Sequence, residues 1–390
     1  MARRVILAAV VFLLVGVGVF LFTRPAPEPM YKGKSVSAWF NDFLPSSLEN
    51  SAKANAARTA IRAIGTNAVP KVIELLRCRD SAPRKLFIRL AAKQKVLTFR
   101  FRPSAERLNL VGMRGAQLLG TNAGATAPYL TPFLNHSNYY TRMSALIALQ
   151  RIGPEAKGSA PALFKVLASD PDPRVRLTAF QTIGSLRLRN AEVFPAVTNA
   201  LSDGDRSIRV EVLHWLTGTG IEPSKLAPVF VDQLRGSDPI VKTVAMRELA
   251  WMKIDVTNAI PFLEQLTNDP DVQVKLAARG TLERLTGKHF PRPANEEAVF
   301  EYNFANTPIS QVIQEYKSLV KTPVEVGDIP HPWGLVQIYT VGAVTKSEAI
   351  ALIESALKNQ VGVVVEKSAD GTLTMKYASG NESIKSHWVN

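Results

Sequence analysis

One phrase recurs four times in the chain: SDPDPRVRLTAF at 169–180, SDGDRSIRVEVL at 202–213, SDPIVKTVAMRE at 237–248 and NDPDVQVKLAAR at 268–279. Prolines that precede apolar runs lie 33, 34, 33 and 33 residues apart, at Pro128, Pro161, Pro195, Pro228 and Pro261. Basic residues that follow the phrase's turn lie 34, 33, 33 and 33 residues apart, at Arg142, Arg176, Arg209, Lys242 and Lys275. Two markers with one period indicate a repeat protein whose units stack on their neighbours.

Each unit reads as two helices joined by a tight turn. Pro161 suits a first helical turn, because its missing N–H would have no partner there. Apolar residues at helical spacing follow, and SDPDP then ends the helix, since residues before proline resist the α region. A second apolar stripe runs from Val175 to Ile183, and Gly184 is expected to end that helix in a left-handed conformation. A pair this short cannot bury its apolar face alone, so we expect the pairs to stack.

The sequences APALFKVLASDPDPRVRLTAFQTIG and FPAVTNALSDGDRSIRVEVL resemble the HEAT repeat family, in particular the short repeats of phycobilisome-lyase-like proteins. The resemblance covers roughly 50–287, with helix pairs near 50–78 and 108–285. It implies a mainly α fold, a right-handed α-solenoid of helix pairs, and it implies no particular chemistry.

Three acidic residues each precede a basic residue by six positions. The pairs are Asp170 with Arg176, Asp203 with Arg209, and Asp269 with Lys275. We interpret them as a structural ladder, in which each carboxylate caps backbone N–H groups and pairs with neighbouring basic residues. The alternative is a charged stripe that binds a ligand. The unit with Gly236 and Asp238 departs from this pattern, so its turn is expected to differ.

A basic insert interrupts the period at 79–107, where Pro70 and Pro128 lie 58 residues apart. One reading is a basic amphipathic helix over 83–95 that lies on anionic lipid. Others are a strand-like TFRFR segment that docks an acidic partner, and an insert that packs on the solenoid with its charges in water. Nucleic acid is not an expected partner. The candidate contacts to lipid or an acidic partner are Arg84, Lys85, Arg89, Lys93, Lys95, Arg100 and Arg102.

The N-terminal segment Val5–Phe22 carries no charge. As a helix it would rise about 27 Å, close to the thickness of the hydrocarbon core. Arg3 and Arg4 favour a cytoplasmic N-terminus, which places the rest of the chain in the periplasm. A cleaved signal peptide is the alternative, but cleavage after Ala26 would place Arg24 at a position that prefers small residues. We therefore predict an uncleaved, single-pass anchor in the inner membrane.

The period stops after Gly287, and the residues beyond it predict a small α+β module. Strands are expected at VFEYNF (299–304), PVEV, LVQIYTV, VGVVVEK and TLTMKY. Thr307 and Pro308 are expected to start one helix, and Thr345 with Glu348 forms a capping box that starts another. The order β-α-β-β-α-β-β predicts one compact sheet with two helices on one face.

The stretches FEYNFANTPISQVIQEYKSLVKTPVEV and SEAIALIESALKNQVGVVVEKSADGTLTMKY are similar to the periplasmic N-domains of secretins and to the short N-terminal module of TonB-dependent receptors. The resemblance covers about 80 residues and follows apolar spacing. In those families such modules contact one another in rings or bind inner-membrane partners. The resemblance implies binding to other proteins.

No motif for catalysis or metal binding occurs in the chain. The one cysteine, Cys78, excludes disulfides within the chain and multi-thiolate metal sites, and it is expected to be buried on a helix. The five histidines are scattered, and no GxSxG, HExxH or Walker-type sequence is present. His214 and Trp215 are expected to line the core or the inner surface, and Gly218–Gly220 to form a helix end. Trp333 is expected either to fill a gap beneath the C-terminal sheet or to contact a partner. We expect no catalytic residue, cofactor, metal or small-molecule substrate.

The sequence thus predicts this organisation: a cytoplasmic 1–4, an anchor 5–22, a linker 23–35, a solenoid 36–287, a linker 288–297, a module 298–378 and a tail 379–390. The expected function is a membrane-anchored scaffold of the bacterial envelope that binds other proteins, in the class of secretion or pilus components. Two alternatives are an accessory protein of the lyase-like HEAT class and a protein that binds anionic membrane surfaces through the insert.

Overall fold

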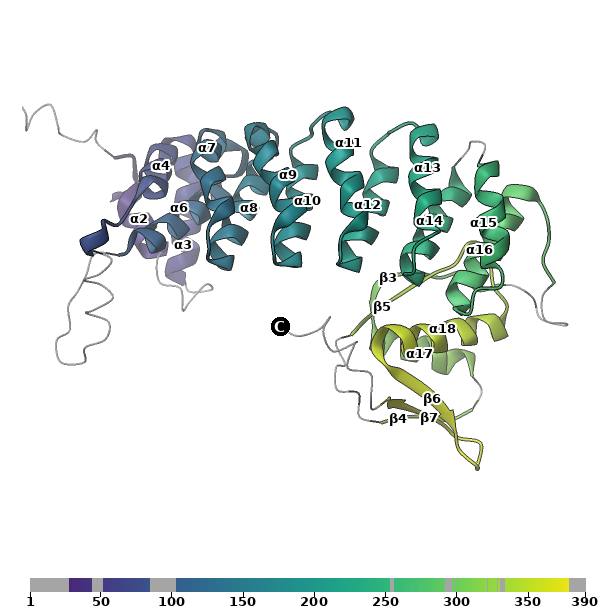
Figure 1. Ribbon diagram of the computed structural model, residues 1–390. Coiled ribbons are helices and arrows are strands. Elements are labelled where there is room, and N and C mark those ends of the chain that lie inside the picture. Colours follow the sequence, from purple (N-terminus) through teal and green to yellow (C-terminus); the bar gives the residue numbers. More distant parts are fainter. Residues whose placement is uncertain are drawn as a thin grey trace, which may run out of the picture. The chain divides into compact units, whose positions relative to one another are not determined.

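The computed structural model describes residues 28–43, 52–84, 103–252, 256–291, 297, 299–320, 322–327, 329 and 334–378. These residues form two compact units that divide between Val193 and Phe194. Figure 1 shows the helices and strands with their labels. Within the described ranges no helix is both long enough and apolar enough to cross a bilayer. The predicted anchor Val5–Phe22 lies outside these ranges.

The first unit opens with a hairpin of β1 (Met30–Tyr31) and β2 (Lys34–Ser35), and helices follow it. The helices are α2 (Val36–Phe43), α3 (Ala52–Ile64), α4 (Val69–Arg77), α6 (Ala105–Leu119), α7 (Ala127–Leu130), α8 (Tyr139–Ile152), α9 (Ala160–Ser169) and α10 (Pro173–Ser185). Short 3₁₀ turns connect them at Gly65–Ala68, Gly120–Thr126, Thr131–Asn135 and Gly153–Ser159. Helix α11 (Asn190–Asn199) contains the division between the units.

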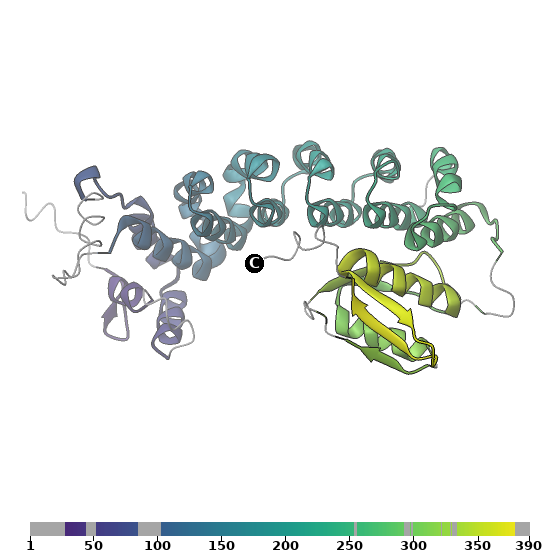
Figure 2. The same cartoon turned by 60° about the horizontal axis from the view of Figure 1, so that its bottom comes forward.

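The second unit holds the remaining helix pairs and the C-terminal module. Its repeat helices are α12 (Arg206–Gly218), α13 (Pro223–Gln233), α14 (Pro239–Trp251), α15 (Ile260–Leu266) and α16 (Val272–Thr286). The 3₁₀ turns Ala200–Ser202 and Thr257–Ala259 precede α12 and α15. Helix α14 packs against both α12 and α16, so the second helices of successive pairs form one row (Figure 2).

An aspartate begins the second helix of each of the last four pairs. The N-caps are Asp172, Asp205, Asp238 and Asp271, and each carboxylate accepts a hydrogen bond from the backbone amide two residues later. These residues lie 33 positions apart. An N-cap of this kind satisfies an amide that the helix itself leaves without a partner, so it places the turn at the same point of each repeat.

Several local predictions within the repeats need correction. Helix α10 continues through Gly184 to Ser185, and the left-handed residue is Arg187, with φ 52°. Pro161 lies in the first turn of α9 as expected, but Pro195 lies inside α11, because that helix begins earlier, at Asn190. Pro228 likewise lies inside α13. Cys78 follows the last residue of α4 and is half-buried, so it is not a buried helical residue.

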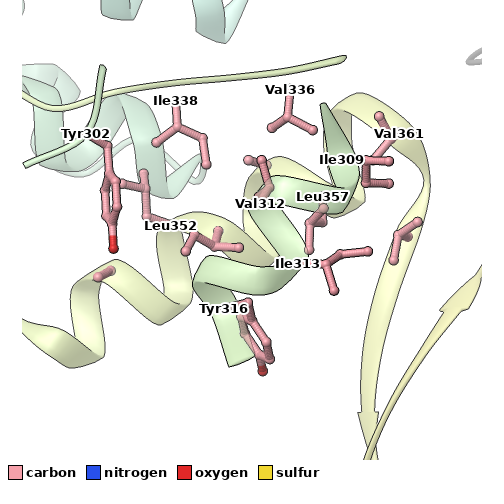
Figure 3. Close-up of a cluster of buried hydrophobic side chains, with 14 of the residues drawn as sticks. Tyr302, Ile309, Val312, Ile313, Tyr316, Val336, Ile338, Leu352, Leu357 and Val361 are labelled. Atoms are coloured by element: carbon pink, nitrogen blue, oxygen red, sulfur yellow. The ribbon is translucent and has the colours of Figure 1, made fainter. Parts of the chain in front are cut away.

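The C-terminal module has the predicted order of elements. They are β3 (Asn303–Pro308), α17 (Ile309–Leu319), β4 (Val324–Val326), β5 (Leu335–Tyr339), α18 (Lys346–Val361), β6 (Val363–Lys367) and β7 (Leu373–Tyr377). Thr345 and Glu348 form the predicted capping box at the start of α18. Figure 3 shows side chains from both helices and from β5 pointing into one apolar core.

The prediction of a single sheet is wrong, because the strands of the module form two sheets. Strand β3 pairs with β5 in one antiparallel sheet, and the other has the order β4-β7-β6 with β4 parallel to β7. The backbone amide of Gln337 donates to Gln360 Oε1 at 2.8 Å, and Gln360 Nε2 donates to the carbonyl of Gln337 at 2.7 Å. This side chain occupies the edge of β5 that a further strand would use, and so it separates the two sheets.

The start of the module also differs from prediction. Strand β3 begins at Asn303, and Phe300 forms only an isolated bridge with Val344. Thr307 pairs with Val336 inside β3 and does not cap α17. The amide of Ile309 donates instead to the carbonyl of Gly334. The first amide of α17 is therefore satisfied by a backbone carbonyl from a distant segment, and not by the side chain of Thr307.

Candidate functional site

A buried ion pair links two successive repeats of the first unit. Arg142 on α8 donates to both carboxylate oxygens of Asp170, at 2.8 and 3.0 Å. The side chains are 10% and 5% exposed. Arg142 also donates to the carbonyls of His136 and Ser137. The guanidinium thus joins the turn before its own helix to the turn of the next repeat.

The second unit repeats this arrangement. Arg209 donates to Asp238 at 2.5 Å, and Lys242 donates to Asp269 at 3.2 Å. Arg209 also contacts the aspartate six positions before it, but through the backbone: Arg209 Nη1 donates to the carbonyl of Asp203 at 2.6 Å. In the first unit Arg176 donates to the carbonyl of Asp170 in the same way, at 2.8 Å.

The aspartates of the predicted ladder also hold their own turns. Asp170, Asp203 and Asp269 each accept a hydrogen bond from the backbone amide two residues later. Lys275 lies half-buried in the first turn of α16. These contacts lie within and between repeats, which favours a structural role for the ladder over ligand binding.

The unit that departs from the pattern has a different turn. Gly236 stands where an aspartate is found in the other repeats, and Asp238 both caps α14 and accepts from Arg206 and Arg209. Burial opposes ionisation of Asp238, but the hydrogen bonds and charges of the two arginines hold its pKa below the usual range. In this repeat one carboxylate therefore both caps the helix and pairs with the arginines of the preceding repeat.

Of the seven basic candidates in the insert, the structure describes Arg84. Its side chain pairs with Asp80 at 2.9 Å and donates to the carbonyl of Pro103 at 3.2 Å. Asp80 also accepts from the amide of Ala105, the first residue of α6. Arg84 therefore joins the two ends of the insert. The other candidates, Lys85, Arg89, Lys93, Lys95, Arg100 and Arg102, lie outside the described residues, as does Trp333.

The second unit contains an open pocket of about 460 Å³ where the module packs against the repeat helices. Helices α12 and α14 form one wall, and strands β3 and β5 form the other. The pocket is lined by His214, Thr217, Arg247, Glu248, Trp251, Asn303, Ala305 and Tyr339.

Arg247 connects the two walls of this pocket. Its guanidinium donates to Glu248 at 2.7 Å and to Asn303 Oδ1 on β3 at 3.2 Å. It also lies 4.5 Å from the ring centre of Tyr339, and the ring of His214 meets that tyrosine edge-on at 5.9 Å. Tyr339 is therefore held between α12 and α14, as an anchor of the module on the repeats.

Two polar atoms of this pocket have no hydrogen-bond partner among the described residues, namely His214 Nε2 and the hydroxyl of Tyr339. Burial, together with the charge of Arg247, lowers the pKa of His214, so the imidazole is neutral at physiological pH. Burial raises the pKa of Tyr339. The pocket thus presents neutral hydrogen-bonding groups beside a charge-compensated arginine.

An exposed tryptophan forms the outer part of the pocket. Trp251 ends α14 and is 61% exposed. The guanidinium of Arg284 lies 3.4 Å from its ring centre and donates to the carbonyl of Ala250 at 3.0 Å. The stacked arginine fixes the indole on one side and leaves it open to solvent.

The module also packs closely on α16. Asn359 donates to Asp271 at 3.0 Å, and a Cβ added to Gly280 would overlap the carbonyl oxygen of Val341. His214, Arg247 and Gly280 lie 33 residues apart, so they occupy one column on the row of second helices. His214 was expected to line the core or the inner surface, but this column was not recognised from the sequence. The signal in the sequence was Gly280, because a glycine in the middle of a helix costs stability and implies close packing.

The helix end that the sequence predicts near Gly218–Gly220 is present. Helix α12 ends at Gly218, and Gly220 adopts a positive φ of 70°. No group of three or more His, Cys, Asp or Glu side chains in the part of the chain that the structure describes is arranged to hold a metal ion.

A sequence profile of HEAT repeats matches residues 160–229. The matched stretch begins with α9 and reaches into α13, and it contains the N-cap residues Asp172 and Asp205. No curated protein matches the sequence at a significant level.

The chain also matches solved structures. One is the CpcE–CpcF complex of phycocyanin lyase from Nostoc sp. PCC7120, at 18% identity and a TM-score of 0.29, covering 68% of this chain and 92% of that one. YibA from E. coli matches at 15% identity and a TM-score of 0.32, covering 65% and 92%. An engineered protein matches at 15% identity and a TM-score of 0.36, covering 64% and 68%.

The stability of the second unit is expected to fall as the pH drops below about 6.5, the ordinary pKa of histidine. The pKa of His214 is lower in the folded state than its ordinary value of 6.5, so the unfolded chain binds the proton first. The stabilisation that depends on a neutral His214 is complete above that ordinary value. It is lost as the pH falls through the folded-state pKa. Thermal unfolding at a series of pH values measures this slope.

The variant His214→Gln is expected to flatten the pH dependence, because it removes the buried titrating group. His289→Gln is the matched control, since His289 is exposed in the same unit and should leave the slope unchanged. Equal slopes in the two variants would contradict the role given to His214.

Proposed function

We propose that this protein is a membrane-anchored scaffold of the bacterial cell envelope, which binds partner proteins through its HEAT repeats and its C-terminal module. The observation that carries the proposal is the exposed pocket at Trp251. HEAT-repeat proteins commonly bind other proteins, and tryptophan, tyrosine and arginine supply most hot spots of protein interfaces. Here Trp251, Tyr339, Arg247 and Arg284 meet at one site.

The location in the envelope rests on the N-terminal sequence. Val5–Phe22 has the length and apolar character of a membrane span, with Arg3 and Arg4 on its N-terminal side. The similarity of residues 300–377 to secretin N-domains supports a partner from a secretion or pilus system. Both features favour a chain whose repeats and module lie in the periplasm.

Binding, without catalysis, is the proposed role of the pocket. Its arginine is compensated by Glu248 and fixed by Asn303, so it already has partners for its charge and its hydrogen bonds. His214 faces the ring of Tyr339, and among the described residues no serine or cysteine lines the pocket to act as its nucleophile. Neutral polar atoms beside aromatic rings are suited to holding a peptide segment.

The proposal is tested by photo-crosslinking in intact cells, with a photoreactive amino acid at position 251 and, as a control, at position 140. Tyr140 is 72% exposed and lies on α8 in the first unit. We expect position 251 to form a specific adduct with an envelope protein, and Arg284→Ala to weaken that adduct because it removes the stacked support of the indole. Identical adducts from the two positions, or none from position 251, would remove the support for the pocket.

A reporter fused after Asn390 tests the location in the same strain. Alkaline phosphatase, which needs the oxidising periplasm, is expected to be active there and to lose activity when Val5–Phe22 is deleted. A cytosolic fluorescent signal from the same fusion site would overturn the proposed topology.

A further inference from the structure

The N-terminal hairpin of the first unit presents an unusual surface. Met30 is 62% exposed, and Lys32 and Gly33 at the tip are exposed as well. The ring of Tyr31 lies 6.4 Å from that of Trp39 on α2, whose indole N–H donates to the carbonyl of Tyr31 at 3.1 Å. An exposed methionine, a tyrosine, a tryptophan and lysines therefore gather in one small element.

The lysines of the hairpin lie over its aromatic rings. Lys34 Nζ is 4.4 Å from the ring centre of Trp39, and Lys32 Nζ is 5.6 Å from that of Tyr31. Lys34 also pairs with Asp42, whereas Lys32 has no ion pair among the described residues. Aromatic rings with an apolar body and a polar edge, beside lysines, are typical of groups that lie at the boundary between lipid and water.

The hairpin is fixed to the body of the first unit. The amide of Ser37 donates to Glu28 at 2.9 Å, and the amide of Val36 donates to the carbonyl of Pro29. The hydrogen bonds from Ser37 lower the pKa of Glu28, so its carboxylate stays ionised as a cap of α2. The ring of Phe40 lies against Gly115 of α6. The hairpin is therefore attached to α2, and α2 is attached to α6.

The distance from this fixed point to the proposed membrane span is short. Five residues, Thr23–Pro27, separate Phe22 from Glu28, and two of them are prolines. A stretch of this length spans at most about 20 Å. A tether so short gives the hairpin a high effective concentration at the bilayer surface, so even a weak affinity for lipid would keep it there.

We propose that the hairpin Met30–Lys34, together with Trp39, inserts into the headgroup region of the membrane and binds anionic phospholipid. This inference rests on the proposed membrane anchor and adds a second contact to it. Met30 enters the boundary of the acyl chains, Tyr31 and Trp39 lie at the level of the headgroups, and Lys32 pairs with lipid phosphate. The contact orients the first unit on the bilayer surface.

The test uses the full chain reconstituted into vesicles of phosphatidylglycerol and phosphatidylcholine. Cys78→Ser removes the one cysteine, and a nitroxide label is placed through Met30→Cys or through Tyr140→Cys. Both positions are highly exposed in the same unit, at 62% and 72%. Power saturation then compares the accessibility of each label to oxygen, which enters lipid, and to a nickel chelate, which remains in water.

We expect the label at 30 to shift toward high oxygen and low nickel accessibility, while the label at 140 keeps the values of an aqueous site. Lys32→Glu should shift the label at 30 back toward water in anionic vesicles. Unchanged depth in Lys32→Glu would overturn the role of lipid charge.

Flotation of the same vesicles separates this inference from the anchor. If the chain floats and resists carbonate extraction while both labels are aqueous, the hairpin contact is overturned and the anchor remains. If the chain does not float, the anchor and the hairpin contact are overturned together. The unfolding transition of the Met30→Cys chain, compared with that of the Tyr140→Cys chain, shows whether the change at position 30 itself disturbs the first unit.

Discussion

Replacement of Asp170 by alanine is expected to destabilise the first unit by about 3–5 kcal/mol. The side chains of Asp170 and Arg142 are 5% and 10% exposed, and they share two hydrogen bonds. The variant leaves a buried guanidinium without its counter-charge, and the desolvation of that group is then not compensated. Denaturant unfolding followed by circular dichroism measures the shift of the transition that belongs to this unit.

Two further variants distinguish the buried charge from a general effect of substitution. Arg189→Ala removes an ion pair with Glu192 in which the arginine is 87% exposed, and it should cost less than about 1 kcal/mol. Arg142→Met combined with Asp170→Leu should be less destabilising than Asp170→Ala alone, since no uncompensated charge remains. A single variant at Asp170 that behaves like Arg189→Ala would refute the proposed importance of the inter-repeat pair.

Replacement of Gly280 by alanine is expected to release the C-terminal module from α16, with a loss of stability of about 3 kcal/mol. The added Cβ would overlap the carbonyl oxygen of Val341, and its next contacts are the carbonyl carbon and Cβ of that residue, at 3.0 and 3.2 Å. Two of these three atoms belong to the backbone, so a rotamer change cannot relieve the overlap. The helix or the segment after β5 must move.

Limited proteolysis of the second unit measures this release. Cleavage in the segment between α16 and β3 should become faster in Gly280→Ala, because the module no longer holds both ends. Gly218→Ala is the matched control: Gly218 also lies in a second helix, and nothing approaches its added Cβ within 4 Å. That variant should keep wild-type protection. Equal cleavage rates in the two variants would mean that the module does not rest on α16 through this contact.

The accuracy of the sequence predictions follows the range of the interactions that decide each feature. The repeat period, the order of the seven elements in the module and the capping box at Thr345 were predicted correctly. The helices, turns and cap behind these predictions are each set by residues a few positions apart. The start of α17 and the division into two sheets were predicted wrongly, because the contacts of Ile309 with Gly334 and of Gln360 with Gln337 come from distant residues.

The candidate site was only partly visible in the sequence. His214 was singled out, but its partners Arg247 and Tyr339 were not, since one lies a repeat away and the other in the module. The aspartates of the ladder were recognised, but the sequence did not show which basic residue each carboxylate contacts. Arg142 reaches Asp170 across 28 residues, and Arg209 reaches Asp238 across 29.

By itself the amino-acid sequence determined the repeated helix pairs, their turns and the apolar faces that make them stack, because hydrophobic period, proline and N-cap aspartate act on their own neighbours. Only the tertiary structure decided which carboxylate each arginine pairs with, how the strands divide into two sheets, and that His214, Arg247 and Gly280 form one column beneath the module. The physical reason is that these contacts depend on the close approach of surfaces far apart in the chain, and such an approach leaves no local pattern apart from a glycine in the middle of a helix.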